Sequence, residues 1–203
     1  ELSTTTLGKE IRYTTDGSKP TATSAIYKQA IPFTKNLSIN AGVFKEGKLI
    51  DKVFTQELLY HKGIGATITI NKEPSKSYPG SGVAGLINGI KGSDSRYGDS
   101  EWVGFWGEDM EIEIEFKKPI EVNEIELRLY HAPGQWIYAP NKFYLKTESS
   151  KGTINISEVT HLEPLENLAI SNKSIKPIKL ELNKQKINII RNIKITIPNY
   201  GII

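Results

Sequence analysis

Alternation of apolar and polar residues marks the start of the chain. Ile11 and Tyr13 alternate with polar neighbours, and the pair Asp16-Gly17 then interrupts the run. A period of two places alternate side chains on one face of a β-strand. An Asp-Gly pair favours a turn, because Asp bonds the backbone two residues on and Gly adopts positive φ without steric cost. The pattern predicts a strand from Ile11, a turn, and a return strand over residues 25–27.

The same alternation continues through the rest of the first sixty residues. Every second residue is apolar over residues 37–43, and another strand-like run covers residues 53–58. Between these runs, residues 45–48 contain Gly47, which suits the left-handed position of a hairpin turn. Several short strands with closely spaced turns indicate an all-β sandwich. We therefore expect residues 1–60 to form a small immunoglobulin- or fibronectin-like sandwich.

A glycine-rich join at residues 60–66 leads into a second region of strand patterns. Between Ile112 and Phe116 the apolar residues alternate with glutamates, so one face is apolar and the other is charged. One buried face and one solvated face are typical of antiparallel sheets. Residues 162–169 carry a short helical pattern of a single turn. The strands that we expect within residues 61–203 cover residues 67–70, 110–116, 124–130, 142–146, 178–182 and 187–197.

Composition indicates a folded chain and argues against nucleic-acid binding, membrane spans and cysteine chemistry. Hydrophobic residues make up 38% and charged residues 24% of the 203 residues, and the net charge is +3. Acidic and basic residues are interspersed, so the chain lacks the basic face typical of nucleic-acid binding. No apolar run approaches the ~18 residues of a membrane span, and there is no cysteine for disulfide or thiolate chemistry. We expect no nucleic-acid partner and no membrane interaction.

The turn after Tyr13 resembles a known module. Residues 13–21 read Tyr-Thr-Thr-Asp-Gly-Ser-Lys-Pro-Thr. This is similar to the signature of a small β-sandwich appended to secreted bacterial glycosidases, best known from chitobiases and β-N-acetylhexosaminidases. The resemblance implies a module on the C-terminal side of an enzyme, which it supports. The chain begins at Glu1 without an initiator Met, so we expect a fragment or a processed product whose catalytic part lies upstream.

Four segments of the second region carry another resemblance. They are Tyr78-Pro79-Gly80 and residues 86–93, 102–110 and 134–140. With them, residues 66–203 resemble a discoidin-type domain, the galactose-binding-like jelly roll of coagulation-factor C domains and many carbohydrate-binding modules. The order of the two modules is typical of the C-terminal end of bacterial β-N-acetylhexosaminidases. The resemblance implies an all-β chain in which a discoidin-like jelly roll over residues 61–203 follows the first sandwich, in a bacterial protein that is secreted, periplasmic or at the cell surface.

The resemblance also raises the question of a structural calcium ion. Relatives usually carry Leu-x-Asp-Gly where this chain has Leu86-Ile87-Asn88-Gly89, and that Asp often helps to hold calcium. An amide oxygen is an uncharged and poorer ligand for a hard cation. We therefore expect no cofactor, and only if calcium were bound would Asn88 and Asp94 be its ligands.

The acidic cluster at residues 108–115 is a candidate for the catalytic carboxyl pair of a glycosidase. Glycosidases need two carboxyl groups ~5–10 Å apart across a cleft, and alternate residues on one strand face lie ~6.5–7 Å apart. An exposed strand face, however, gives no desolvation, which a proton-holding acid requires. The histidines, His61, His131 and His161, are too far apart in sequence for a zinc motif. We expect this cluster to form a solvated face without a catalytic residue. Its members are Glu108, Asp109, Glu111, Glu113 and Glu115.

Sugar binding is the function that the second region favours. Aromatic faces pack on the C–H surface of a sugar ring, and polar groups on nearby loops fix the hydroxyls. Trp136 lies in a loop with Pro at both ends, and we expect it to contact the sugar with Arg96 or His131. Trp102, Phe105 and Trp106 precede a strand and are expected to pack in the core. The candidate loop residues are Arg96, Tyr97, Asp99, His131, Gln135, Trp136 and Tyr138.

Several alternatives stay open at this point. The expected ligands are glycans that contain N-acetylhexosamine or galactose, but an exposed Trp136 would equally pack against the upstream catalytic domain. A protein-interaction or surface-tethering module needs an exposed apolar patch without a sugar-shaped cleft. A lipid-surface module needs apolar loop tips ringed by basic residues. Ile64, Val83 and Ile137 supply such tips, although the basic ring around them is thin.

Overall fold

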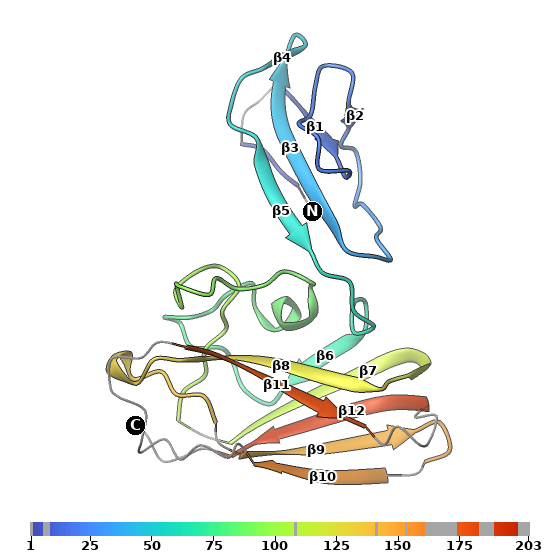
Figure 1. Cartoon of the computed structure of the whole chain (residues 1–203), viewed down its shortest axis with the longest axis vertical. Helices are drawn as coiled ribbons and strands as arrows, with labels where there is room; N and C mark the ends of the chain where they lie inside the picture. The colour runs from blue at the N-terminus through green and yellow to red at the C-terminus, as the bar shows by residue number, and fades with distance from the viewer. Residues whose placement is uncertain are drawn as a thin grey trace. The chain divides into compact units, whose positions relative to one another are not determined.

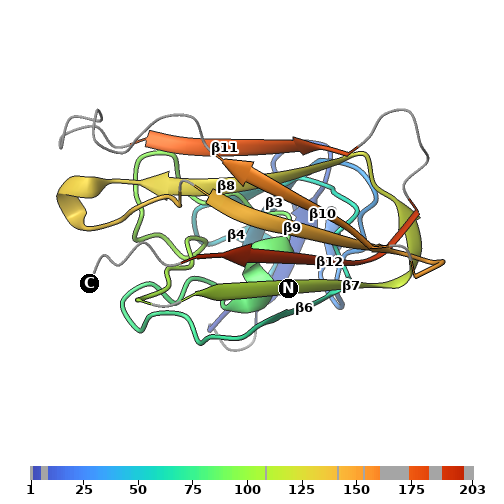
Figure 2. The same ribbon diagram turned by 90° about the horizontal axis from the view of Figure 1, so that it is seen from below.

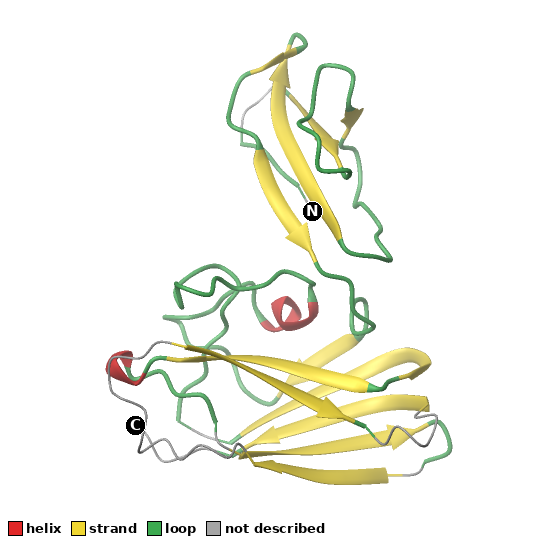
Figure 3. Cartoon of the chain, in the orientation of Figure 1, coloured by secondary structure: helices red, strands yellow, loops and turns green. Residues whose placement is uncertain are grey.

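The computed structural model describes residues 2–5, 9–107, 109–140, 142–152, 154–160, 174–182 and 189–198. Within these ranges the chain is all-β, with two short 3₁₀ helices, η1 (Val83–Ile87) and η2 (Pro133–Gln135) (Figure 3). The chain divides into two compact units. Unit 1 comprises Glu1–His61 and Gly89–Lys91, and unit 2 comprises Lys62–Asn88 and Gly92–Ile203. The division after His61 lies one residue from the expected boundary between residues 60 and 61.

Unit 1 contains a five-stranded antiparallel sheet (Figure 1). Its long central strand β3 pairs with β1, β4 and β5, and β2 pairs with β1. The predicted turn is present: Asp16 Oδ1 accepts hydrogen bonds from Ser18 N at 3.0 Å and Ser18 Oγ at 2.6 Å. The strands are β1 (Glu10–Thr14), β2 (Ala25–Ile26), β3 (Leu37–Lys45), β4 (Lys48–Leu49) and β5 (Phe54–Leu58).

Strand β3 is buried on both faces, although its alternating sequence suggests one apolar face only. Ile39 and Ala41 are buried on one side, and Asn40 and Phe44 on the other. Asn40 is satisfied there, because its Nδ2 donates to Ser18 O at 3.0 Å and its Oδ1 accepts from Thr55 Oγ1 at 2.6 Å. The loop after β1 therefore covers the second face of β3. Ser18 of this loop supplies the acceptor that the buried Asn40 amide needs.

Unit 2 is built from two antiparallel sheets. The larger has the order β10-β9-β12-β7-β6, and the smaller pairs β11 with β8 (Figure 2). Every predicted strand is present, most of them longer than predicted, and β10 is an addition. The helical pattern at residues 162–169, Glu108 and His161 lie outside the described residues. The strands are β6 (Thr67–Ile70), β7 (Met110–Glu121), β8 (Glu124–His131), β9 (Lys142–Ser149), β10 (Ile154–Thr160), β11 (Ser174–Glu181) and β12 (Ile189–Ile197).

The core of unit 2 lies between these sheets. Phe143 is fully buried and Ile195 is 1% exposed. Every second residue of β8 packs against this cluster from the smaller sheet. Apolar residues at alternate positions of β7, β9 and β12 form the rest of the core, as the period-two pattern predicts. The core residues from the larger sheet include Ile112, Phe116, Phe143, Leu145, Ile190, Ile193 and Ile195.

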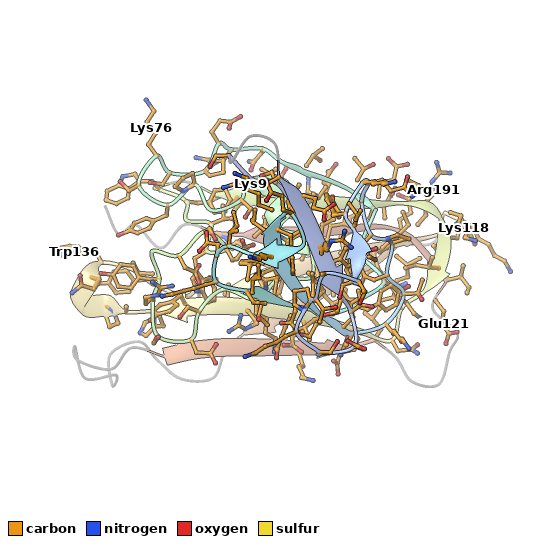
Figure 4. The ribbon with its side chains drawn as sticks, turned by 90° about the horizontal axis from the view of Figure 1, so that it is seen from above. Lys9, Lys76, Lys118, Glu121, Trp136 and Arg191 are labelled. Carbon is orange, nitrogen blue, oxygen red and sulfur yellow. The ribbon has the colours of Figure 1, made fainter. Side chains whose placement is uncertain are left out.

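Antiparallel pairing gathers one set of loops at the same end of unit 2. Ile70 of β6 pairs with Ile112 near the start of β7, and Ile197 at the end of β12 pairs with Met110. Residues 132–140 connect the end of β8 toward the start of β9, whose Tyr144 pairs with Thr196 of β12. We call residues 71–82, 92–107 and 132–140 the loop end. Figure 4 shows Trp136 there, and Lys118, Glu121 and Arg191 at the opposite end of the unit.

Candidate functional site

The segment of residues 92–102 is fastened by its own side chains. Asp99 Oδ1 accepts hydrogen bonds from Glu101 N at 2.9 Å and Trp102 N at 3.1 Å, and Asp99 Oδ2 accepts one from Ser93 N. Ser93 Oγ accepts from the backbone N of Ser95 and of Arg96, each at 3.2 Å. Short polar side chains favour such local bonds to the backbone. The loop is therefore ordered without regular secondary structure.

Trp102 is a structural residue of this loop, as predicted. Its Nε1 donates to Ser93 O at 2.9 Å, and its ring meets Tyr130 edge to face at 5.2 Å between centroids. The Arg128 guanidinium lies 5.2 Å from the Trp102 ring centroid, within the range of a cation–π contact. A Cβ on Gly92 would lie 2.6 Å from Trp102 Nε1, so the backbone approaches the indole as only glycine allows. Trp102 thus ties the loop to β8.

Trp136 sits at the tip of a tight turn and is 69% exposed. Ala132 and Ile137 close the turn with two backbone hydrogen bonds, Ala132 N to Ile137 O at 2.8 Å and Ile137 N to Ala132 O at 3.2 Å. Trp136 has φ 59° and ψ 27°, the left-handed region that a bulky residue rarely adopts. Such strain, on the order of 1 kcal/mol, persists only when the surroundings impose it. Figure 4 shows the residue at the outer edge of the loop end.

Tyr97 connects this turn to the fastened loop. Its hydroxyl Oη donates to Gln135 Oε1 at 3.0 Å, next to Trp136. The Tyr97 ring is held edge to face by Tyr78 at 6.0 Å and by Tyr130 at 5.7 Å between centroids. The structure therefore brings three of the predicted residues together: Tyr97, Gln135 and Trp136. They come from two segments about forty residues apart in the sequence.

His131 and Arg96 are placed differently from the prediction. His131 is only 1% exposed, its Nδ1 accepts from Ala139 N at 3.3 Å, and its ring lies 6.0 Å from that of Tyr138. A ring this buried does not reach a ligand at the surface, so the expectation that His131 touches sugar is wrong and the residue supports the turn instead. Arg96 is exposed on the neighbouring loop. In the part of the chain that the structure describes, no contact joins its guanidinium to the Trp136 turn.

The two residues considered for calcium are held by different partners. Asn88 Nδ2 donates a hydrogen bond to Glu101 Oε2 at 3.0 Å. Asp94 Oδ1 forms an ion pair with Arg128 at 2.5 Å. Among the residues with defined positions, no three His, Cys, Asp or Glu side chains gather as a metal site. Hard cations need several converging oxygen ligands, and these two residues point to different partners.

The glutamates of β7 lie on its outward face, as predicted. Lys194 Nζ of β12 lies 2.8 Å from Glu111 Oε2 and 3.6 Å from Glu113 Oε1, and Arg191 pairs with Glu115 at 3.5 Å. The hydrogen bond that Lys194 Nζ donates to Glu111 Oε2 raises the pKa of Lys194. We call these five residues the charged ladder. Glu113 and Glu115 are largely exposed, so no enclosed pair of carboxyl groups is formed here.

Trp106 corrects the prediction that it packs in the core. It is 66% exposed, whereas Trp102 and Phe105 are partly buried. Trp106 lines an open hollow of about 290 Å³ together with Asn71, Lys72, Glu73 and Ser75. The sequence does not single out these residues as a site, although the polar run directly after β6 indicates a surface loop.

Comparison with known proteins gives a family-model match to the first part of the chain. Residues 1–58 match the family model described as "Fn3 associated". Among solved structures, a mutant of the lectin-binding domain of Lectinolysin in complex with Lewis b is similar at 10% identity and a TM-score of 0.44. That alignment covers 71% of this chain and 90% of the other. No curated protein matches the chain. None of the helices in the described ranges has the length and apolar character of a membrane span.

Proposed function

We propose that unit 2 binds neutral sugar residues through the exposed indole of Trp136. The observation that carries this proposal is the Trp136 turn itself, in which a large aromatic ring is exposed and held in a costly backbone conformation. A protein that hides this ring would gain stability from burying its apolar area. Exposure on a braced turn instead leaves the ring ready to stack on a ligand, with little ordering needed on binding.

The neighbouring groups suit a weakly bound pyranose ring. Gln135 directly precedes Trp136 in the sequence, and its amide oxygen accepts a hydrogen bond from Tyr97, which fixes the position of the amide. Amide groups bond sugar hydroxyls as donors and as acceptors. One stacked ring with one or two hydrogen bonds is worth a few kcal/mol, so we expect dissociation constants in the millimolar range. The glycans proposed as ligands contain N-acetylhexosamine or galactose.

We further propose that the chain is a non-catalytic accessory region of a bacterial β-N-acetylhexosaminidase-like glycoside hydrolase that is secreted, periplasmic or at the cell surface. The Fn3-associated match over residues 1–58 supports an accessory role for unit 1. The solvated charged ladder, which offers no desolvated acid, supports the view that catalysis belongs to another domain. Unit 1 then acts as a spacer, and the catalytic domain of the parent protein is its partner.

Calorimetric titration of the chain with N-acetylglucosamine and galactose oligosaccharides tests the binding proposal. We expect saturable binding at millimolar ligand, and a loss of at least about tenfold in affinity for Trp136→Ala, because the stacking surface is removed. Trp136→Phe is the matched control and should retain part of the affinity. Absence of heat at millimolar ligand, or unchanged binding by Trp136→Ala, would contradict the proposal.

A structural or tethering role is the second candidate, and unit 1 provides the observation that favours it. Phe54 is 52% exposed, and Leu49 and Ile50 are 44% and 43% exposed, at the strands that flank β3. Exposed apolar residues of this size are typical of surfaces that contact another protein. If glycans fail to bind unit 2 while Phe54→Ser weakens association with the parent catalytic domain, this role replaces sugar binding.

A further inference from the structure

We infer that Trp106 and the hollow beside it form a second sugar subsite, separate from the Trp136 turn. The subsite would take one neutral pyranose ring, stacked on the Trp106 indole. This inference rests on the proposed function for its class of ligand, and on different residues for its geometry. Both tryptophans belong to unit 2 and to its loop end.

The walls of the hollow are fixed by backbone hydrogen bonds. Asn71 N donates to Glu111 O at 3.1 Å, and Asn71 Oδ1 accepts from Glu111 N at 2.8 Å, which locks the residue after β6 to the start of β7. Ser75 N donates to Gly104 O at 2.8 Å, and Gly104 N donates to Tyr78 O at 2.9 Å. Trp106 lies on the segment between these two attachment points. The indole therefore projects from a braced connection, as a preformed site requires.

The close approach of these segments depends on Gly104. A Cβ at this position would lie 2.9 Å from Tyr78 Cβ, a distance that real side chains essentially never show. The glycine thus lets the segment of residues 71–78 lie directly against the backbone before Trp106. Polar side chains from one segment and an aromatic ring from the other meet across this contact, at the hollow.

The size and lining of the hollow favour a single neutral sugar. About 290 Å³ is at the lower end of the volumes of ligand pockets, which suits one monosaccharide. Among the described residues that line the hollow, Trp106 is the only aromatic one, and the other four are polar. Lys72 and Glu73 carry opposite charges, which argues against an anionic ligand. An apolar peptide side chain would need a mainly apolar lining, whereas sugar hydroxyls can bond to carboxylate, amide, ammonium and hydroxyl groups.

Two subsites at one end of a unit have a consequence for affinity. Strand pairing places both tryptophan loops at the loop end, so a glycan chain or a clustered glycan surface can engage both. Linked weak sites raise apparent affinity by factors of ~10² or more when both are engaged at once. We expect clustered glycan to bind more tightly than free monosaccharide, and we expect that advantage to vanish when either tryptophan is replaced by alanine.

The indole N–H signals in a proton–nitrogen NMR spectrum provide the direct test. The chain has three tryptophans, so it gives three indole signals. Titration with N-acetylglucosamine, and separately with galactose, should shift the signals of Trp106 and Trp136. The signal of Trp102 should stay in place, because its Nε1 donates to Ser93 O inside the loop. Replacing each tryptophan with Phe in turn assigns the three signals.

Variants of residues inside and outside the lining then test whether the ligand binds in the hollow. Lys72→Ala and Glu73→Gln should weaken the response of the Trp106 signal several-fold. Lys76→Ala should leave it unchanged, since Lys76 is exposed, lies outside the lining and projects outward from the ribbon in Figure 4. If Lys72→Ala and Glu73→Gln had no more effect than Lys76→Ala, the subsite would be overturned.

The titration separates this inference from the proposed function. Shifts of Trp136 alone would overturn the second subsite and leave the proposed function standing. Shifts of Trp106 alone would support the subsite and overturn the assignment of binding to Trp136. Shifts of all three signals, Trp102 included, would indicate a general change in structure and count against both sites. No shift at tens of millimolar sugar would overturn both.

Discussion

The charged ladder and the loop end of unit 2 show two opposite uses of polar side chains. On the ladder, glutamates of β7 face Lys194 and Arg191 of β12, so opposite charges meet across the strands. At the loop end, Asp99 accepts hydrogen bonds from the backbone of its own loop, and Tyr97 donates one to Gln135 on the neighbouring turn. The ladder presents an ion-paired, water-facing surface, and the loop end presents two exposed indoles.

The contrast between these two surfaces shows which features mark a binding site in this sandwich. Acidic residues at regular spacing attract attention in the sequence, but on an exposed strand their partners are water and the neighbouring strand. A useful site needs groups that the fold holds in position although they contribute little to stability. Trp136 in its left-handed conformation satisfies this criterion, and so does Trp106 on its braced connection.

The largest expected effect comes from replacing the tryptophan that supports the loop end. Trp102→Ala removes the ring that contacts Tyr130 and Arg128, and with it the donor to Ser93 O. We expect unfolding in urea to show a loss of about 3 kcal/mol, at the low end of the range for large aromatic residues, since Trp102 is only partly buried. Trp136→Ala is the matched control and should change stability by less than about 0.5 kcal/mol.

Equal losses in the free energy of unfolding for the two variants would contradict the distinction between Trp102, which supports the loop, and Trp136, which is exposed for binding. A stable Trp102→Ala variant would show that hydrogen bonds alone hold the loop. Strong destabilisation by Trp136→Ala would show that the Trp136 ring packs on the protein. That result would contradict the proposal that the ring is free to stack on a sugar.

The carboxylate of Asp99 gives the next largest effect. It accepts three backbone N–H bonds, and Asp99→Asn keeps only one of the two carboxylate oxygens, so at least one partly buried donor loses its acceptor. We expect a loss of about 1–3 kcal/mol in the free energy of unfolding. Asp94→Asn is the matched control, because Asp94 is 83% exposed in its pair with Arg128 and should cost under about 1 kcal/mol. A smaller loss for Asp99→Asn than for Asp94→Asn would contradict the described loop.

The strands and tight turns of this fold follow closely from the sequence. Alternation along β7 predicts which residues face the core, and Gly47 predicts the turn between β3 and β4, where it has φ 74°. Strand β10 carries the same signal, since Ile154 and Ile156 alternate with polar residues, but the run is short and easily overlooked. Local pattern suffices for these elements because the period of two is a property of the backbone itself.

The candidate site follows from the sequence only in part. Trp102 and Trp106 lie four residues apart in one motif, yet one is fixed by Ser93 and Tyr130 while the other is exposed. The contacts that decide between these outcomes come from distant segments, so no local pattern distinguishes the two residues. His131 is a similar case, because its burial depends on the loop that folds back to Ala139.

The smallest effect, and the most specific, concerns the pH dependence of the ladder. The hydrogen bond to Glu111 raises the pKa of Lys194 above its unfolded value. The stabilisation from this pair is therefore fully present below the ordinary lysine pKa of about 10.4 and is lost as the pH rises through the raised value. Lys194→Met should lower the urea midpoint slightly at pH 8, and the difference from the parent chain should shrink toward pH 11.

Lys146 provides a control of opposite sign. It lies directly across from Lys194 on β9, and like charges at facing positions destabilise a sheet. Lys146→Met should therefore leave the midpoint unchanged or raise it, and Lys194→Met should lower it. Because the ladder faces water, 1 M salt should reduce both differences. A difference for Lys194→Met that grows with pH, or one that resists salt, would mean that the lysine has a buried role. The ladder would then no longer be the solvated counterpart of the loop end.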